Sequence, residues 1–165
     1  MIIGIIGYGS IGKDIAKKAK AFGMNVIATR RLQKKVESNK FVDQLIPTSD
    51  LKVLLKNSDY VVISCPLTPL TTNLISLKEL KLMKENAIII NIARGQIINQ
   101  DDLIDALENK IISGAALDVF AKEPLEESSK LFDLDNVIIS PHISGNYPNY
   151  QKDMIDQFAD NLNRF

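Results

Sequence analysis

Ile2-Ile3-Gly4-Ile5-Ile6-Gly7-Tyr8-Gly9-Ser10-Ile11-Gly12, at the start of the chain, is the stretch that decides the fold. Residues 2–6 form an apolar, β-branched run that predicts a buried strand. The six residues that follow have the pattern G-x-G-x-x-G, and Ile11, Ile15, Ala19 and Phe22 then recur at helical spacing. A strand, a glycine loop and a helix in this order indicate the first unit of a dinucleotide-binding fold.

Each glycine of this loop has its own physical reason. Gly7 permits the tight turn, Gly9 lets the backbone approach a pyrophosphate, and Gly12 lets the helix pack closely on the strand. The free N–H groups at the start of the helix would then face the phosphates. The alternative is a glycine-rich turn that binds nothing.

The rest of the chain repeats the alternation of strand and helix. Nearly all-apolar runs predict strands at residues 2–6, 26–29, 60–64, 87–91, 112–117 and 137–139. Helical patterns cover residues 11–22, 51–55, 77–83 and 150–162, and another helix starts at residue 99. Gly23 is a candidate C-cap of the first helix. Residues 121–136 are polar and predict a long loop. We therefore expect an α/β, Rossmann-type, doubly wound parallel sheet.

Composition limits the possible functions. The 165 residues are 45% hydrophobic and fit one domain spanning residues 1–165. Twenty basic and 20 acidic residues cancel, which argues against nucleic acid or an anionic membrane as a partner. With one cysteine, Cys65, and one histidine, His142, we expect no disulfide framework and no metal site. The apolar runs are too short to span a bilayer and no signal-peptide pattern opens the chain, so we expect a cytoplasmic protein.

The end of the second predicted strand bears on the cofactor. In the NAD version of this fold an acidic residue at this place accepts a hydrogen bond from the ribose 2′-hydroxyl. Here Arg30 and Arg31 follow the strand, and neither Asp nor Glu is present. Planar guanidinium groups suit a 2′-phosphate, so we predict NADP(H) as the preferred cofactor, with NAD(H) possible. The alternative is a solvated basic turn.

Six motifs, in order along nearly the whole chain, resemble the D-isomer-specific 2-hydroxyacid dehydrogenase family. They are Gly7–Gly12, Gly23-Met24, Cys65–Thr72, Asn91–Gly95, Gly114–Phe120 with Glu123-Pro124, and Ser140–Gly145. Within the family, the basic residues after the second strand resemble the glyoxylate and hydroxypyruvate reductases. The resemblance implies hydride transfer between nicotinamide and a small 2-keto or 2-hydroxy acid.

The resemblance also implies the catalytic residues Arg94, Glu123 and His142. A guanidinium binds a substrate carboxylate through paired N–H groups. An imidazolium donates a proton as an alkoxide develops, and a neighbouring carboxylate favours its protonated form and fixes its orientation. Without the resemblance, each of the three residues reads as a surface or loop residue.

By the same resemblance, the cofactor is bound along a dinucleotide cleft. Ser10 and Ile11 would offer backbone donors to the pyrophosphate, and Asp118 would hold the nicotinamide end. The cleft would also be lined by Cys65, Ile92, Ala93, Ser144 and Gly145. On its own, Cys65 reads as a small buried hydrophobe.

The resemblance implies that full-length family members have two domains, one for the nucleotide and one for the substrate. This chain begins at the first strand of the nucleotide domain and ends at Phe165. We therefore expect the substrate-binding domain to be absent, turnover by this chain alone to be poor, and apolar surface to be left near both termini. The family also implies a homodimer.

Two functions remain open. The presence of Arg94, Glu123 and His142 favours an enzyme domain, because a binding module needs none of them. The lack of a substrate domain favours a non-catalytic dinucleotide-binding or oligomerisation module. DNA binding is disfavoured, because no basic face stands out.

Overall fold

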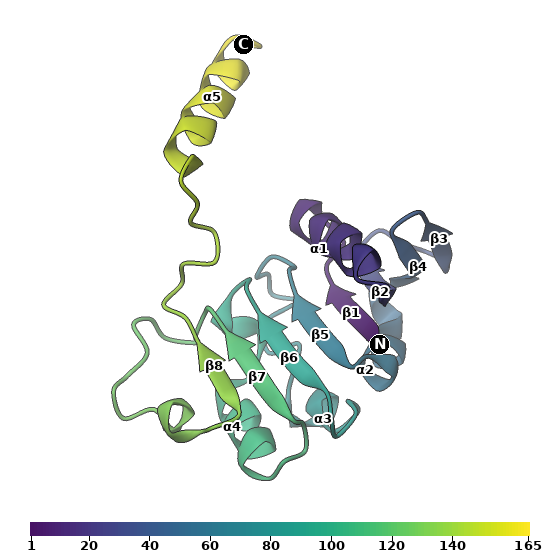
Figure 1. Cartoon of the computed structure of the whole chain (residues 1–165), viewed down its shortest axis with the longest axis vertical. Coiled ribbons are helices and arrows are strands. Elements are labelled where there is room, and N and C mark those ends of the chain that lie inside the picture. Colours follow the sequence, from purple (N-terminus) through teal and green to yellow (C-terminus); the bar gives the residue numbers. More distant parts are fainter.

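A computed structural model describes residues 1–165, which form one sheet of eight strands with helices on both faces (Figure 1). The strand order is β3-β4-β2-β1-β5-β6-β7-β8; β3 and β4 pair antiparallel, and the other neighbours pair parallel. The order extends in both directions from β1, so the predicted doubly wound, Rossmann-type fold is confirmed. The strands are β1 (Ile2–Ile6), β2 (Asn25–Arg30), β3 (Glu37–Asn39), β4 (Val42–Pro47), β5 (Tyr60–Ile63), β6 (Ile88–Asn91), β7 (Gly114–Leu117) and β8 (Val137–Ile139). The α-helices are α1 (Ser10–Ala21), α2 (Leu51–Asn57), α3 (Leu77–Leu80), α4 (Gln100–Glu108) and α5 (Tyr150–Leu162).

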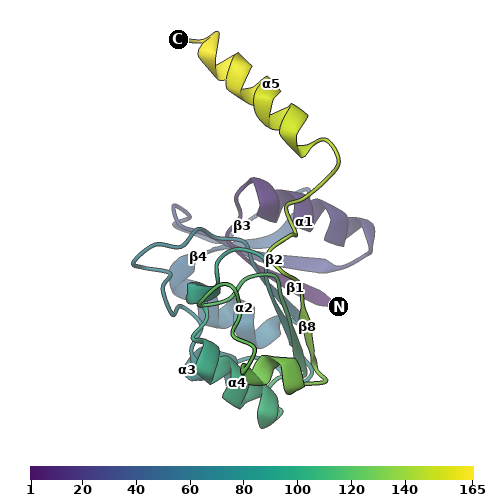
Figure 2. The same cartoon turned by 90° about the vertical axis from the view of Figure 1, so that its left-hand side faces the viewer.

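The two faces of the sheet carry separate hydrophobic cores. A core of 22 buried residues lies on the side of α2, α3 and α4, and a core of 10 lies on the side of α1 (Figure 2). In β5, Val61 and Ile63 belong to the larger core and Val62 to the smaller one. Because alternate side chains point to opposite faces, a strand buried on both sides needs an unbroken apolar run. This explains why the strand runs in the sequence do not alternate with polar residues.

Small residues place α1 close to the sheet. Its buried residues are Gly12, Ala16 and Ala19, so the helix backbone approaches β1 and β2 closely. Phe22 caps the helix, and Gly23 follows with φ +73°, a left-handed conformation that favours glycine. The sequence prediction of a glycine stop at this position is confirmed.

The structure adds a hairpin that the sequence analysis did not predict. Strands β3 and β4 occupy residues 37–47, and β4 pairs with β2. Val42, Leu45 and Ile46 of β4 are buried, but Asp43 and Gln44 interrupt them. The predicted loop at residues 121–136 also contains a turn of 3₁₀ helix, η3 (Lys130–Asp133).

The last helix stands away from the sheet (Figures 1 and 2). Its bounds match the prediction, and its apolar stripe of Tyr150, Met154, Phe158 and Leu162 is between 49% and 67% exposed. The apolar surface expected near the C-terminus is therefore present. No helix in the chain combines the length and the apolar character needed to cross a membrane.

Candidate functional site

The glycine loop links β1 to α1 at the carboxyl edge of the sheet. Gly7 has φ +104°, and a Cβ on it would lie 2.7 Å from the backbone nitrogen of Cys65. A Cβ on Gly12 would overlap the carbonyl oxygen of Gly7. These two glycines are therefore required by the turn and by packing within the chain.

Gly9 is different, because nothing lies within 4 Å of the position that its Cβ would take. Gly9 is also the N-cap of α1, and no side chain caps the helix there. The first N–H groups of an α-helix have no partner within the helix, so they are available to a ligand at this end. Open space beside uncapped N–H groups fits the phosphates of a dinucleotide.

Two hydroxyl side chains support this loop. The Gly7 N–H donates to Thr29 Oγ1 at 3.2 Å, and Ser64 Oγ donates to the Gly7 carbonyl oxygen at 2.9 Å. The Tyr8 N–H donates to the Thr29 carbonyl at 2.8 Å. Neither Thr29 nor Ser64 was predicted to support the loop, although a polar residue at the end of an apolar strand was a usable signal.

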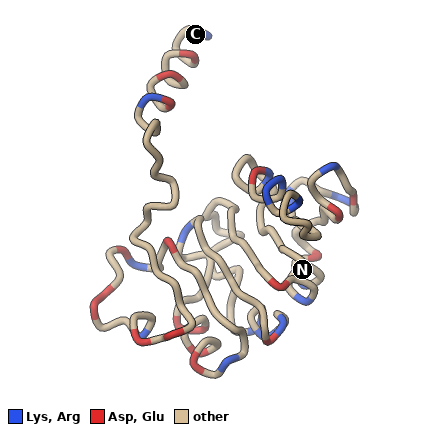
Figure 3. Tube along the Cα trace, in the orientation of Figure 1, with Lys and Arg blue, Asp and Glu red and all other residues tan.

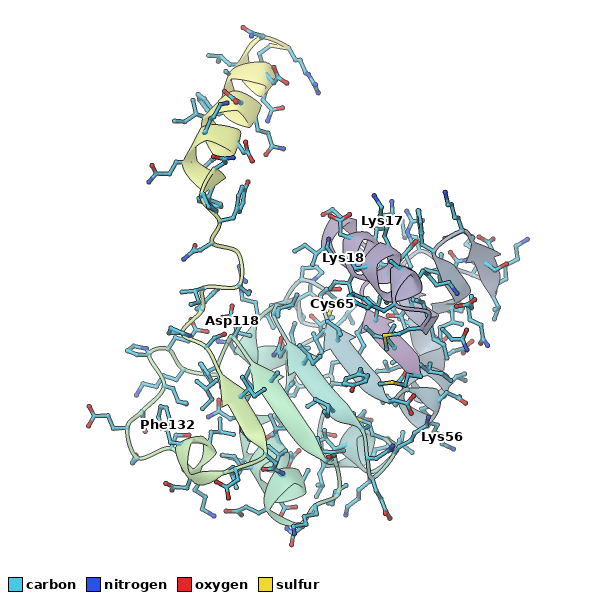
Figure 4. All side chains as sticks on the ribbon, viewed as in Figure 1. Lys17, Lys18, Lys56, Cys65, Asp118 and Phe132 are labelled. Carbon is cyan, nitrogen blue, oxygen red and sulfur yellow. The ribbon has the colours of Figure 1, made fainter.

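A cavity of about 740 Å³ lies beside the loop. Among its lining residues are Gly7, Gly9, Ser10, Thr29, Arg30, Arg31 and Cys65. Figure 4 shows Cys65 near the carboxyl end of β5, beside α1. Burial raises the pKa of the Cys65 thiol, which suits a lining residue and not a nucleophile.

The remaining predicted cofactor residues do not line this cavity. Ile11 is 55% exposed on α1, and Gly12 packs inside. The others lie farther along the same edge of the sheet: Ile92 and Ala93 after β6, Asp118 after β7, and Ser144 and Gly145 after β8. The predicted set is therefore split into two groups along the carboxyl edge, and only the first of them lines the cavity.

Cations gather around the first group. Arg30, Arg31 and Lys13 line the cavity, and Lys13 and Arg30 also border a neighbouring cavity of about 440 Å³ with Lys17. None of these four residues takes part in the five ion pairs of the structure. Figure 3 shows a group of basic residues on α1, together with an acidic one, and other basic residues spread over the rest of the chain. An anionic group would find unpaired donors here.

The end of β6 positions Arg94. Asn91 is buried, its Oδ1 accepts the Ala93 N–H at 3.0 Å, and its Nδ2 donates to the Arg94 carbonyl at 2.9 Å. The Arg94 side chain is exposed, and its Nη1 donates to the Ala93 carbonyl at 2.6 Å. Asn91 thus fixes the backbone, while the other N–H groups of the exposed guanidinium are left to meet an anion. Asn91 was not predicted as a site residue.

Glu123 and His142 come together from two separate loops. Oε2 of Glu123 lies 2.7 Å from Nδ1 of His142, and Oε1 accepts the Phe120 N–H at 3.0 Å. The hydrogen bond from His142 lowers the pKa of Glu123, and the Phe120 N–H and the charge of Arg94 act in the same direction. Because an ionised carboxylate only accepts, Nδ1 of His142 carries the proton and Nε2 is left for a substrate.

Asp118 holds the loop that carries His142. Its Oδ1 accepts from Ser140 Oγ at 2.5 Å and from the Ile143 N–H at 2.9 Å, and its Oδ2 accepts the Ser144 N–H at 3.0 Å. Between these contacts His142 has φ +55°, a conformation that non-glycine residues seldom adopt. Figure 4 labels Asp118 at the carboxyl edge of the sheet.

The same contacts set the charge of Asp118. Burial alone would raise the pKa of Asp118, but the hydrogen bonds from Ser140, Ser144 and Ile143 outweigh it and lower the pKa to about 2. The carboxylate is therefore ionised at neutral pH and binds the His142 loop through charge-assisted hydrogen bonds.

The sheet, the glycine loop and the cavity together define a dinucleotide-binding domain. The chain belongs to the D-isomer-specific 2-hydroxyacid dehydrogenase family, and residues 1–144 match its NAD-binding domain. It is 43% identical over 163 residues to a glyoxylate reductase of Thermococcus gammatolerans, covering 99% of this chain and 48% of that protein. The chain thus spans about half the length of the curated relatives it matches.

Two solved structures show the same likeness. A D-isomer-specific 2-hydroxyacid dehydrogenase of Xanthobacter autotrophicus in complex with NADPH and MES is 31% identical, with a TM-score of 0.91 over 99% of this chain and 66% of that one. The NADPH-dependent glyoxylate/hydroxypyruvate reductase of Sinorhizobium meliloti is 29% identical, with a TM-score of 0.82 over 91% of this chain and 76% of that one.

Proposed function

We propose that the chain is the cofactor-binding and catalytic-residue-bearing part of an oxidoreductase that interconverts a 2-keto acid and a 2-hydroxy acid. The observation that carries this proposal is the 2.7 Å pair of Glu123 and His142, on the same sheet edge as Arg94 and the dinucleotide cleft. A module that only binds a dinucleotide needs no such pair. The activities named for the relatives support the same reaction class.

The nicotinamide, when bound in its reduced form, supplies the hydride that adds to the carbonyl carbon. Arg94 binds the substrate carboxylate through paired N–H groups and so fixes the neighbouring carbonyl. His142 donates the proton from Nε2 to the carbonyl oxygen as negative charge develops there. The Glu123 carboxylate keeps the imidazole in one orientation and stabilises its protonated form. The keto acid gains a hydride and a proton and leaves as the hydroxy acid.

NADP(H) is our proposed cofactor, and Arg30 and Arg31 are its proposed selectors. Both residues line the cavity next to the glycine loop, and neither is held in an ion pair. A 2′-phosphate bound between guanidinium groups and Lys13 would form charge-assisted hydrogen bonds that a 2′-hydroxyl cannot form.

Glyoxylate or hydroxypyruvate is our proposed substrate. Both are small 2-keto acids, in which one carboxylate next to one carbonyl matches the requirements of Arg94 and His142. The names of the relatives from Thermococcus and Sinorhizobium point to the same substrates.

Self-association into a homodimer is also part of the proposal. The exposed apolar stripe of α5 supports association, because monomers seldom leave large apolar patches in water. Light scattering over a hundredfold range of protein concentration tests it. A mass of one chain throughout would overturn it.

Calorimetric titration with NADPH and then NADH, in one buffer, tests the cofactor site without requiring turnover. We expect tighter binding of NADPH. Equal or tighter binding of NADH would overturn the role given to the arginines, and no binding of either would overturn the dinucleotide site. Oxidation of NADPH in the presence of glyoxylate, measured in a full-length context that supplies a substrate-binding domain and lost there in His142→Ala, then tests the reaction. NADPH binding without turnover in that full-length context would favour the non-catalytic module.

A further inference from the structure

Two glutamine side chains hold both backbone groups of one residue, Ala121. Gln96 Nε2 donates to the Ala121 carbonyl oxygen at 2.8 Å, and Gln100 Oε1 accepts the Ala121 N–H at 3.1 Å. Gln96 lies in a turn of 3₁₀ helix, η2 (Gly95–Ile97), and Gln100 is the first residue of α4. The two amides form a clamp on the segment that follows β7.

The backbones meet at the same place. A Cβ on Gly95 would overlap the carbonyl group of Phe120 and would lie close to the backbone nitrogen of Ala121. This glycine therefore lets η2 rest directly on the peptide between Phe120 and Ala121. The packing brings the two segments together, and the two amides fix their register.

Each of the two segments in this contact, η2 and the Phe120–Ala121 peptide, is next to or hydrogen-bonded to a residue of the proposed reaction. Arg94 is the N-cap of η2, directly before Gly95. On the other side, the Phe120 N–H donates to Glu123 Oε1 at 3.0 Å, and Glu123 Oε2 lies 2.7 Å from His142 Nδ1. The clamp thus connects the carboxylate-binding side of the site to the proton-donating side.

We propose that Gln96 and Gln100 are positioning residues that set the placement of Arg94 relative to the Glu123–His142 pair. The proposal rests on the proposed function for its catalytic meaning, but not for the geometry that it predicts. The two glutamines have opposite hydrogen-bonding roles: the Gln96 side chain donates a hydrogen bond and the Gln100 side chain accepts one. Gln100→Glu keeps an acceptor, whereas Gln96→Glu replaces the donor and sets a carboxylate against a carbonyl oxygen.

The first test follows the side-chain carboxyl carbon of Glu123 by NMR as a function of pH. The pKa of Glu123 is held low by His142 and then by the Phe120 N–H. Loosening the clamp weakens these contacts, so the titration midpoint of Glu123 should rise in Gln96→Ala, Gln96→Glu and Gln100→Ala. It should stay at the parent value in Gln100→Glu. The matched control is Gln33→Ala, which removes a 2.7 Å amide bond to the Lys35 carbonyl away from this site.

The second test separates kinetic constants in the active protein. The three disruptive variants should lower kcat/KM for the keto acid by about 10- to 100-fold, because small displacements of catalytic groups are costly. Their affinity for NADPH should be unchanged. A Glu123 midpoint that does not move in Gln96→Ala and Gln100→Ala would overturn the clamp. A midpoint that moves, together with no turnover in a full-length context that supplies a substrate-binding domain, would instead uphold the clamp and overturn the proposed function.

Discussion

Nδ1 of His142 and Oε2 of Glu123 lie 2.7 Å apart, although 19 positions separate the two residues in the chain. One residue follows β8 and the other lies in the loop after β7, so the pair forms only when the sheet brings both loops to the same edge. The fold therefore selects one orientation of the imidazole before any ligand arrives.

Glu123→Gln should lower kcat by about 10²- to 10⁴-fold while leaving NADPH affinity unchanged. A glutamine amide facing Nδ1 donates a hydrogen bond, so it favours the imidazole without a proton at that nitrogen and no longer stabilises the protonated ring. Steady-state kinetics with calorimetry measures both quantities. Glu126→Gln is the control, because it breaks an exposed 2.7 Å ion pair with Lys122. Parent-like kcat in Glu123→Gln would contradict the assignment.

Gly9→Ala should reduce dinucleotide binding, whereas Gly12→Ala should reduce the stability of the fold. Gly9 has φ −89° and open space at its Cβ position, so alanine should fold normally and gain up to about 1 kcal/mol of unfolding free energy. Its methyl group should nevertheless weaken dinucleotide binding by at least about tenfold, because it fills the space next to the uncapped N–H groups.

Gly12→Ala should lose about 1–3 kcal/mol of stability, because its methyl group overlaps the Gly7 carbonyl oxygen. Thermal unfolding and calorimetry on both variants check the contrast. The assignment of open space to a ligand is wrong if Gly9→Ala binds NADPH as tightly as the parent.

Asp118→Asn should release the loop that carries His142. Asparagine keeps one acceptor but turns N–H donors toward backbone N–H groups, so the hydrogen-exchange protection of Ile143 and Ser144 should fall by about tenfold or more at pH 7. Hydrogen–deuterium exchange with mass spectrometry measures this, and the amides of β6 serve as the internal reference.

The pH dependence follows from the direction of the shift. The pKa of Asp118 falls from an ordinary 3.8 to about 2 in the folded chain, so its contribution is complete above pH 3.8. The contribution is lost as the pH falls through about 2. Protection of the two amides in the parent should therefore decrease between pH 4 and pH 2 and should be independent of pH in Asp118→Asn. The same pH dependence of amide protection in the parent and in Asp118→Asn would show that Asp118 does not hold the His142 loop.

Arg30→Ala and Arg31→Ala should each weaken NADPH binding by about 10- to 100-fold and leave NADH binding nearly unchanged, because a hydrogen bond to a charged group contributes about 1.5–3 kcal/mol. Lys56→Ala is a suitable control, since it removes one positive charge from α2, away from Cys65 (Figure 4). Equal losses for both cofactors would mean that the arginines hold something other than the 2′-phosphate.

Strands β1, β2, β5, β6, β7 and β8 could be predicted from the sequence, because each of them is a continuous apolar run. Five of them lie inside the sheet, whereas β8 is an edge strand in which Ile138 is 72% exposed. Strands β3 and β4 could not be predicted from the sequence. Strand β3 consists of Glu37, Ser38 and Asn39 at the sheet edge, and Asp43 and Gln44 break the apolar pattern of β4. Strand β4 is stabilised by pairing with β2, and β3 by pairing with β4, and not by their own periodicity.

The glycine loop and the pairing of Glu123 with His142 could be expected from the sequence, because these residues occupy motifs that are continuous in sequence. The supporting residues could not, since Asn91, Gln96 and Gln100 act through side-chain bonds to backbone atoms whose positions depend on the folded loops. Asp118 was predicted from its motif, but its three bonds around His142 became visible only when β7 and β8 lay side by side.

The unequal cores on the two faces of the sheet have a consequence for the lifetime of the protein. The glycine loop leads into α1, which covers the core of 10 residues and not the core of 22. Local opening is easiest where the least apolar surface is buried, so we expect the α1 side to open first and to be the first target of a protease. A bound dinucleotide holds this side closed by mass action. The supply of cofactor in the cell would then govern how long each molecule survives, in addition to how fast it works.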